Sequence, residues 1–218
     1  MRVKVVSAKF WRPHAAVSER DLSAVLPRLR EELREGRHQP GEALNISDVA
    51  QRLGFSPTPV REALAHLAGE GLLRERRGQG YFVASVDAEI LAERYGLQQL
   101  YLAAALRAPS RAVPLPVLTT EAVPSATELV FAAIIAAAGD SALAEAHQRL
   151  SHQLAAARRV EQRLFGDPER ELATLGRLFD AKDRSGLEVA CEAYHQRRRG
   201  AASELVALLR AGPVSWNI

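Results

Sequence analysis

The side chains best suited to chemistry in this sequence are arginines gathered in one N-terminal stretch. Arg61 stands alone, whereas Arg74, Arg76 and Arg77 form a cluster. The guanidinium fork of arginine can bind a guanine edge or a phosphate through two parallel hydrogen bonds. These residue types therefore indicate nucleic-acid recognition.

The tetrapeptide Ser56-Pro57-Thr58-Pro59 predicts the start of a helix just before Arg61. Ser is a preferred N-cap, and Pro is tolerated in the first turn because the amide there has no partner within the helix. The helical period turns Val60 and Leu64 inward and Arg61 outward. Such a helix start offers free N–H groups and a positive dipole end to a phosphate.

Other elements must position this helix on DNA. A helix is predicted over 22–36, and Pro27 requires that it begin near that residue. A short strand at 42–44 and a helix over 47–53 capped by Ser47 follow. Two short strands within 72–86 enclose the basic turn Arg76-Arg77-Gly78-Gln79-Gly80. Helix, strand, helix, helix and hairpin is the order of a winged helix-turn-helix, in which the second helix of the turn enters the major groove.

The predicted winged domain covers residues 18–86, after an N-terminal arm over 1–17. Residues 1–86 hold 14 basic and 10 acidic side chains, and residues 87–218 hold 15 and 16, so the basic excess lies in the predicted DNA-binding part. The residues predicted to contact DNA lie at the helix starts and on the hairpin: Ser47, Ser56, Thr58, Pro59, Arg61, Arg74, Arg76, Arg77, Gly78 and Gln79.

The segment GEALNISDVAQRLGFSPTPVREALAHLAGEGLL, with RRGQGYFV after it, resembles the N-terminal domain of GntR-type bacterial transcription regulators. Eight of the nine residues of that family's Ser-Arg-Thr-Pro-Val-Arg-Glu-Ala-Leu signature occur at 56–64. The resemblance implies a transcription regulator that binds a pseudo-palindromic DNA operator as a homodimer. A repressor is favoured, and an activator stays open. Pro57 replaces an Arg that touches DNA in the family, so operator preference or affinity should differ from that of typical relatives.

The C-terminal half is predicted to be an all-α bundle over 87–210, followed by a tail over 211–218, so the fold class is mainly α. Helices are expected over 87–107, 125–138, 141–165, 168–182 and 185–210. Ser125 and Glu128 form a capping-box pattern at the second of these helices. The proline-rich stretch 109–124 cannot form a continuous helix.

The phrases FAAIIAAAGDSALAE and ELATLGRLFDAKD resemble the FCD ligand-sensing domain of the fatty-acid-regulator branch of the GntR family. The resemblance implies a small-molecule effector, with a carboxylate as one candidate. Family metal-ligand positions carried onto this chain fall on Glu128, Ala132, Leu172 and Tyr194, with His195 one step out of register. Three ligands are missing, so we expect no metal or other cofactor. The candidate effector contacts are Gln98, Glu128, His152, Tyr194 and His195.

Other classes of function fit less well. Cys191 and His195 share a helix face without a third ligand, and His147, Ser151 and His152 lack an orienting acid, so we predict no enzyme. The 218 residues hold one Cys, no secretory leader and no apolar run long enough for a membrane helix, which favours a cytoplasmic protein without a membrane partner. Two alternatives stay open: a winged-helix adaptor that binds protein, and a regulator without a small-molecule effector.

Overall fold

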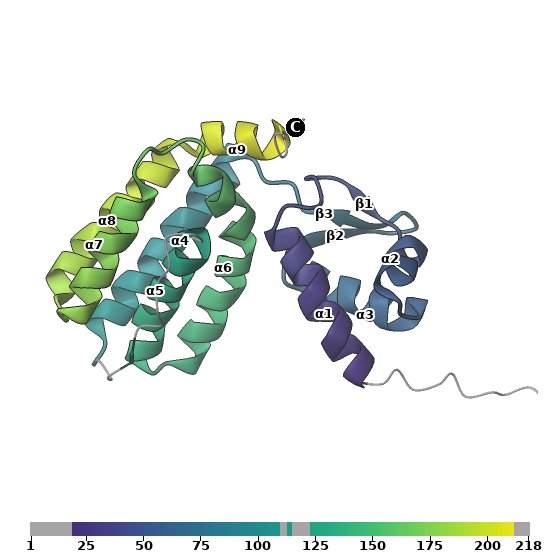
Figure 1. The fold of residues 1–218 in the computed structure, drawn as a ribbon, viewed down its shortest axis with the longest axis horizontal. Coiled ribbons are helices and arrows are strands. Elements are labelled where there is room, and N and C mark those ends of the chain that lie inside the picture. Colours follow the sequence, from purple (N-terminus) through teal and green to yellow (C-terminus); the bar gives the residue numbers. More distant parts are fainter. Residues whose placement is uncertain (1–18, 110–112, 115–122, 212–218) are drawn as a thin grey trace, which may run out of the picture.

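A computed structural model describes residues 19–109, 113–114 and 123–211. Figure 1 shows two parts side by side, an N-terminal part with a small sheet and a C-terminal bundle of helices. Each part packs around its own hydrophobic core. The predicted arm over 1–17, most of the proline-rich stretch 109–124 and nearly all of the tail lie outside the described residues. The predicted boundary at residue 86 lies between the last strand and the first bundle helix.

Helix α1 (Glu19–Arg34) packs Val25 and Leu29 into the N-terminal core. Pro27 lies in the middle of this helix, so the expectation of a helix start near residue 27 was wrong. The ring of Pro27 is exposed, and the buried side chains on either side of it hold the helix together despite the missing N–H.

The two helices that follow form the helix-turn-helix. Helix α2 (Ile46–Leu53) is capped by Asn45 and not, as predicted, by Ser47: Oδ1 of Asn45 accepts from the Ser47 backbone N–H at 2.8 Å. Gly54 ends α2 with φ 76°, a left-handed conformation that glycine adopts readily. Helix α3 (Pro57–Gly69) begins at the predicted place, with Ser56 extended before it, but the Ser56 side chain makes no capping hydrogen bond.

Three short strands complete the N-terminal part. β1 (Ala43–Leu44), β2 (Leu73–Arg76) and β3 (Gly80–Val83) form an antiparallel sheet in the order β1-β3-β2. Leu44 pairs with Tyr81, and Arg76 pairs with Gly80 at the end of the hairpin. The core beneath the sheet is made by buried residues of the helices and strands: Val25, Leu29, Leu44, Val49, Val60, Leu64, Leu67, Leu73 and Tyr81.

The bundle contains α4 (Ala88–Arg107), α5 (Val123–Ala138), α6 (Ser141–Glu161), α7 (Pro168–Asp180), α8 (Arg184–Gly200) and α9 (Ala202–Ala211). No helix in the described ranges is both long and apolar enough to cross a bilayer. Asp87 caps α4 as the first residue of the predicted bundle, accepting from the Ile90 backbone N–H at 2.8 Å.

Two predicted helix boundaries in the bundle were wrong. The helix expected from Ser125 already begins at Val123, so Ser125 and Glu128 form no capping box; the Glu128 carboxylate binds arginine side chains instead. The single helix expected over 185–210 divides at Ala201, where the backbone leaves the helical conformation (φ −101°, ψ 18°). The mainly α architecture, with a winged helix-turn-helix and a helical C-terminal part, is as predicted.

Candidate nucleic-acid interface

The first turns of α3 present a polar, basic face to solvent. Val60 and Leu64 are fully buried, and this fixes the rotation of the helix so that Thr58 and Arg61 are exposed. Arg61 makes no hydrogen bond or ion pair with any residue in the described part of the chain. Its guanidinium is therefore available to a ligand outside the protein. Of the first three residues of α3, Thr58 alone carries a backbone N–H, because Pro57 and Pro59 have none.

The hairpin of β2 and β3 carries the second group of arginines. Arg74, Arg76 and Arg77 are all exposed. The guanidinium of Arg76 lies 4.3 Å from the centre of the Phe82 ring, which holds that charge on the outer surface of the hairpin. The turn is closed by the Gln79 N–H donating to the Arg76 carbonyl at 2.9 Å. The hairpin is thus an exposed cationic edge.

Helix α3 and the hairpin meet at Tyr81. Burial and the charge of Glu75 raise the pKa of Tyr81, while the positive charge of Arg61 opposes the shift, which places Arg61 within electrostatic reach of β3. The start of α3 and the hairpin are two exposed basic regions of the same domain, as in a winged helix-turn-helix that contacts both base edges and phosphates.

Nine of the ten predicted DNA contacts lie at the surface. Ser47 is exposed on α2, and Ser56 and Thr58 are exposed at the start of α3. Gly78 and Gln79 are exposed in the turn between β2 and β3. Pro59 is the correction: it is buried, because it turns inward with Val60, and it can support the helix start but cannot reach DNA.

The sequence of this part of the chain also matches a known protein family. The profile described as "Bacterial regulatory proteins, gntR family" matches residues 21–83, which span α1 to β3. Residues 21–83 belong to the gntR family. The gntR-family domain thus contains the whole sheet and all the predicted DNA contacts.

The curated relatives match through the gntR-family domain. The Nta operon transcriptional regulator of Aminobacter aminovorans is 36% identical over 69 residues, which cover 32% of this chain and 33% of that protein. The HTH-type transcriptional regulator YdhC of Bacillus subtilis is 31% identical over 70 residues, 32% of this chain and 31% of that protein. The chain thus matches about a third of the length of these relatives.

Solved structures extend the likeness over both parts of the chain. E. coli McbR/YncC has a TM-score of 0.59 at 22% identity, over 84% of this chain and 97% of that one. A GntR transcriptional regulator from Rhodococcus sp. RHA1 has a TM-score of 0.59 at 18% identity, over 87% and 99%. The bundle that follows the gntR-family domain thus shares the overall fold of these proteins.

The end of α3 joins the gntR-family domain to the bundle. The Glu70 carboxylate accepts two hydrogen bonds from Arg30 of α1, at 2.5 and 3.2 Å. The Glu70 carbonyl accepts from Nε2 of Gln153 on α6 at 2.8 Å, and Nδ1 of His152 lies 3.6 Å from the Glu70 carboxylate. Burial raises the pKa of Glu70, but the hydrogen bond and charge of Arg30 outweigh it, so the pKa is lowered overall and the carboxylate is ionised.

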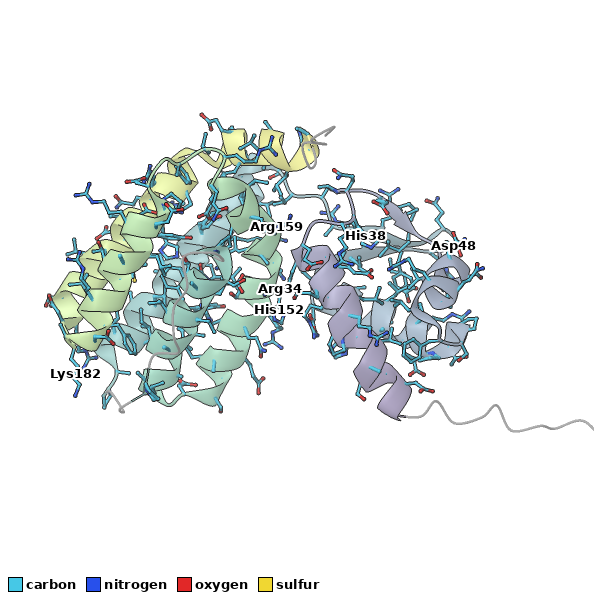
Figure 2. All side chains as sticks on the ribbon, in the orientation of Figure 1. Arg34, His38, Asp48, His152, Arg159 and Lys182 are labelled. Atoms are coloured by element: carbon cyan, nitrogen blue, oxygen red, sulfur yellow. The ribbon has the colours of Figure 1, made fainter. Side chains whose placement is uncertain are left out.

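A second contact joins the two parts through Glu128. Its carboxylate accepts from Arg34 of α1 at 2.7 Å and from Arg158 of α6 at 2.8 Å. Arg159 adds a hydrogen bond to the Arg34 carbonyl at 3.3 Å. Figure 2 shows Arg34, His152 and Arg159 together between α1 and α6. Glu128, predicted as an effector contact, thus holds the gntR-family domain against the bundle.

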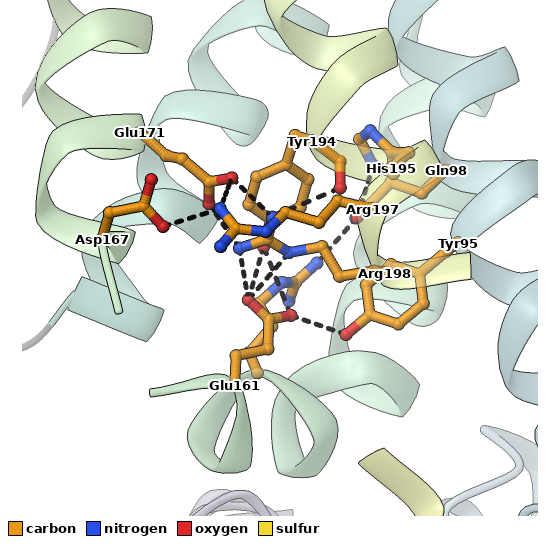
Figure 3. A network of polar contacts seen from close by, with 10 residues as sticks. Tyr95, Gln98, Glu161, Asp167, Glu171, Tyr194, His195, Arg197 and Arg198 are labelled. Atoms are coloured by element: carbon orange, nitrogen blue, oxygen red, sulfur yellow. Dashed lines mark hydrogen bonds and ion pairs between the residues drawn. The ribbon is translucent and has the colours of Figure 1, made fainter. Parts of the chain in front are cut away.

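Three other predicted effector contacts, Gln98, Tyr194 and His195, meet inside the bundle (Figure 3). The Gln98 side-chain oxygen accepts from Nη2 of Arg158 at 2.9 Å and lies 3.2 Å from Nε2 of His195. Because that oxygen is held by Arg158, the Gln98 amide nitrogen donates to Nε2 of His147, at 3.2 Å. Burial, with the charge of Arg158, lowers the pKa of His147 to about 4, which agrees with a neutral ring that accepts this bond.

The buried carboxylate of Glu161, the last residue of α6, completes this network. Glu161 accepts from Tyr95 at 2.6 Å, from Tyr194 at 3.1 Å and from Nε of Arg198 at 3.0 Å. Arg198 also binds both oxygens of Glu171, at 2.9 and 2.6 Å. Each of these buried charges therefore has an opposite charge beside it.

The positions that correspond to family metal ligands take part in other contacts. Leu172 is buried in the apolar core and Ala132 is exposed, while Glu128 and Tyr194 contact arginine or glutamate side chains. Within the ranges that the structure describes, no group of three or more His, Cys, Asp or Glu could hold a metal ion. Nor do Cys191 and His195 form a thiol pair: Nδ1 of His195 lies 2.6 Å from the Cys191 backbone carbonyl.

Sequence reasoning missed Arg158, Glu161 and Arg198 as interior residues. A signal was present on α6, where Leu150, Leu154 and Ala157 define the buried face and Arg158 and Glu161 continue it at helical spacing. Charged residues that continue an apolar stripe are candidates for a buried ion-pair network.

Proposed function

We propose that the protein is a bacterial transcriptional regulator, more specifically a repressor, that binds a pseudo-palindromic operator as a homodimer. The single observation that carries this proposal is the exposed basic surface formed by the start of α3 and the hairpin, with Arg61 and Arg77 lacking partners within the described protein. The curated relatives are named transcriptional regulators over this same domain, which supports the assignment. A protein with this role works beside the chromosome, in the cytoplasm.

In the proposed complex, α3 enters the major groove by its N-terminal end. Arg61 binds a guanine edge or a phosphate, and the Thr58 N–H, with the positive end of the helix dipole, faces a phosphate. Arg74, Arg76 and Arg77 lie along the backbone of the flanking DNA and add salt-dependent affinity. Pro57 stands exposed where the family carries an arginine, so we expect base preference at that position to come from Thr58 and Arg61.

The bundle supplies the proposed dimer contacts. Leu97 and Leu100 on α4 are 40% and 66% exposed, and Val189 on the adjacent α8 is 68% exposed. Helix α4 packs against α8, and large exposed apolar side chains on such a pair of helices are candidates for a protein contact surface. Two domains tethered in this way bind two half-sites with an effective concentration that one domain lacks.

Regulation by a small molecule without a metal cofactor completes the proposal. The contacts from Glu70 and Glu128 connect the DNA-binding domain to the bundle, so a ligand that favours one arrangement of the two parts would change DNA affinity. The arginines in the bundle place positive charge near the family's metal positions, which supports the absence of a metal.

The test is DNA binding by fluorescence anisotropy, with duplex fragments from the region upstream of the protein's own gene. Arg61→Ala should weaken operator binding by about 10-fold or more, since a good base contact is worth roughly 1–3 kcal/mol. Arg77→Ala should weaken specific and non-specific binding alike and reduce the salt slope by about one. Arg149→Ala, at an exposed position on α6, is the matched control and should change neither quantity.

Two results would contradict the proposal. One is wild-type protein that binds no fragment at any salt concentration. The other is binding that Arg61→Ala and Arg77→Ala leave unchanged, which would favour a winged helix that serves protein contact.

A further inference from the structure

A cavity of about 360 Å³ lies between the gntR-family domain and the bundle. Its volume falls within the range typical of small-molecule sites. The N-terminal wall comes from the residues after α1 and from the end of the sheet, and the opposite wall from α6 and α9. An occupant of this junction cavity would touch both parts of the protein at once.

The walls of the junction cavity are largely apolar. Leu72 and Val86 line it on the side of the DNA-binding domain, and Ala156, Val160 and Leu208 line it on the side of the bundle. The polar lining groups are histidine, glutamine and arginine side chains, and no Asp or Glu is among the described residues that line it. The cavity therefore suits a molecule with an apolar body and rejects a cation.

Arg94 on α4 gives the junction cavity its clearest polar feature. It is half-buried and lines the cavity, yet it makes no hydrogen bond or ion pair with any residue that the structure describes. Burial and the nearby positive charge of Arg74 lower the pKa of Arg94, with Asp87 opposing only in part. A partly desolvated guanidinium without a paired carboxylate is stabilised by an anion that enters the cavity.

Arg159 adds positive charge at the same cavity. Its Nη1 donates to the Arg34 carbonyl at 3.3 Å, which leaves its charge without a carboxylate partner among the described residues. Three arginines line the junction cavity, Arg94, Arg159 and Arg163, and no acid lines it among the described residues, so the cavity is electropositive.

We propose that the junction cavity binds a small molecule with an apolar body and one anionic head group, which Arg94 binds. Gln98, Tyr194 and His195 do not line this cavity, whereas His152 does. The occupant contacts the DNA-binding domain and the bundle simultaneously, so it shifts the balance between arrangements of the two parts. That consequence for DNA affinity rests on the proposed function; the ligand site itself does not.

The experiment uses 1-anilinonaphthalene-8-sulfonate, a fluorescent apolar monoanion, on the full chain without DNA. The uncharged N-phenyl-1-naphthylamine is its matched comparison. We expect saturable sulfonate binding that Arg94→Met weakens by about 10-fold or more, because a charge-assisted hydrogen bond is lost. Arg94→Met should leave binding of the uncharged compound nearly unchanged, and Arg149→Met should leave both unchanged.

A second variant fills the space instead of removing the charge. Ala156→Phe places a ring in the cavity from α6 and should abolish binding of both compounds while the protein still unfolds cooperatively. The proposal is overturned if Arg94→Met and Ala156→Phe both bind the sulfonate as tightly as wild type does.

DNA binding supplies an independent readout. Saturating sulfonate should change the dissociation constant for the upstream DNA, and DNA should change that of the sulfonate by the same factor. Arg94-dependent sulfonate binding by a protein that binds no DNA would refute the proposed function and leave the ligand site standing. DNA binding without Arg94-dependent sulfonate binding would refute the ligand site and leave the proposed function standing. Equal DNA affinity with and without sulfonate would refute the coupling between the ligand site and DNA binding.

Discussion

Replacing Arg158 with Met tests how strongly the buried network in the bundle stabilises the protein. Arg158 is almost fully buried and binds Glu128 at 2.8 Å, Gln98 at 2.9 Å, and the carbonyl and hydroxyl of Ser151 at 3.2 Å each. Met has a similar length but removes the charge and every donor. The substitution therefore leaves a carboxylate, an amide oxygen and a hydroxyl without their shared partner.

The expected loss of stability follows from what remains around Glu128. Breaking a buried ion pair by removing one partner costs about 3–5 kcal/mol. Glu128 retains Arg34, and its side chain is 14% exposed, so the lower end of that range applies. Nε of Arg158 is buried without a hydrogen-bond partner among the described residues, which also lowers the net value of the wild-type side chain. We expect a loss of about 3 kcal/mol and a fall in Tm of roughly 6–12 °C.

The assay is thermal unfolding followed by circular dichroism at neutral pH. Arg149→Met, on the same helix but exposed, is the control and should shift Tm by less than about 2 °C. The double variant Arg158→Met with Glu128→Gln should lose less stability than the sum of the two single variants, because the groups are coupled. A Tm within about 2 °C of wild type for Arg158→Met, or strictly additive losses, would refute a stabilising role for this ion pair.

Two further predictions concern the bundle. The pKa of His147 lies at about 4 in the folded protein, below its unfolded value, so the unfolded state binds more protons and the stability present above pH 6.5 is lost as the pH falls toward 4. Urea unfolding midpoints should therefore fall more steeply over that window for wild type than for His147→Gln, and equal slopes would contradict the assignment. If the proposed dimer forms through α4 and α8, Leu100→Glu should convert it to monomer in sedimentation equilibrium and weaken DNA binding. Leu164, which is 37% exposed and lies on neither helix, provides the control, and Leu164→Glu should do neither; a dimer that Leu100→Glu leaves unchanged would exclude the α4 and α8 surface.

The local chemistry of the N-terminal part made its fold predictable. Ser56 to Leu64 predicted both the start and the inward face of α3, and the glycines around Gln79 predicted the hairpin. The two wrong helix predictions in this part concern the cap of α2 and the start of α1, where one local preference outweighed another. Asn45 caps α2 because it stands one residue before the helix, and α1 continues through Pro27 because burial of its apolar face outweighs the missing N–H.

The contacts between the two parts of the chain were beyond the reach of sequence patterns. Glu128 was predicted as an effector contact, and Arg94 and Arg158 were given no role. Only the packing of α6 against α1 and α5 decides that Glu128 and Arg158 form an ion pair. The same packing creates the junction cavity, whose lining comes from segments between residues 33 and 209. Sequence periodicity predicts which residues share a face of one helix or strand, and it does not predict contacts between residues this far apart in the chain.

In the part of the chain that the structure describes, helix α3 is attached to the bundle at one end only, through Glu70. Arg30 and Gln153 hold its C-terminal end, and its other end, which Val60 packs into the domain core, carries Arg61. The 13 residues of α3 span about 20 Å, so a tilt of the gntR-family domain by about 5° about Glu70 moves the start of α3 by almost 2 Å. Hydrogen bonds weaken steeply over a fraction of that distance. In the proposed regulator, a small shift at α6 that carries Glu70 with it would therefore be enough to move Arg61 away from its DNA contact.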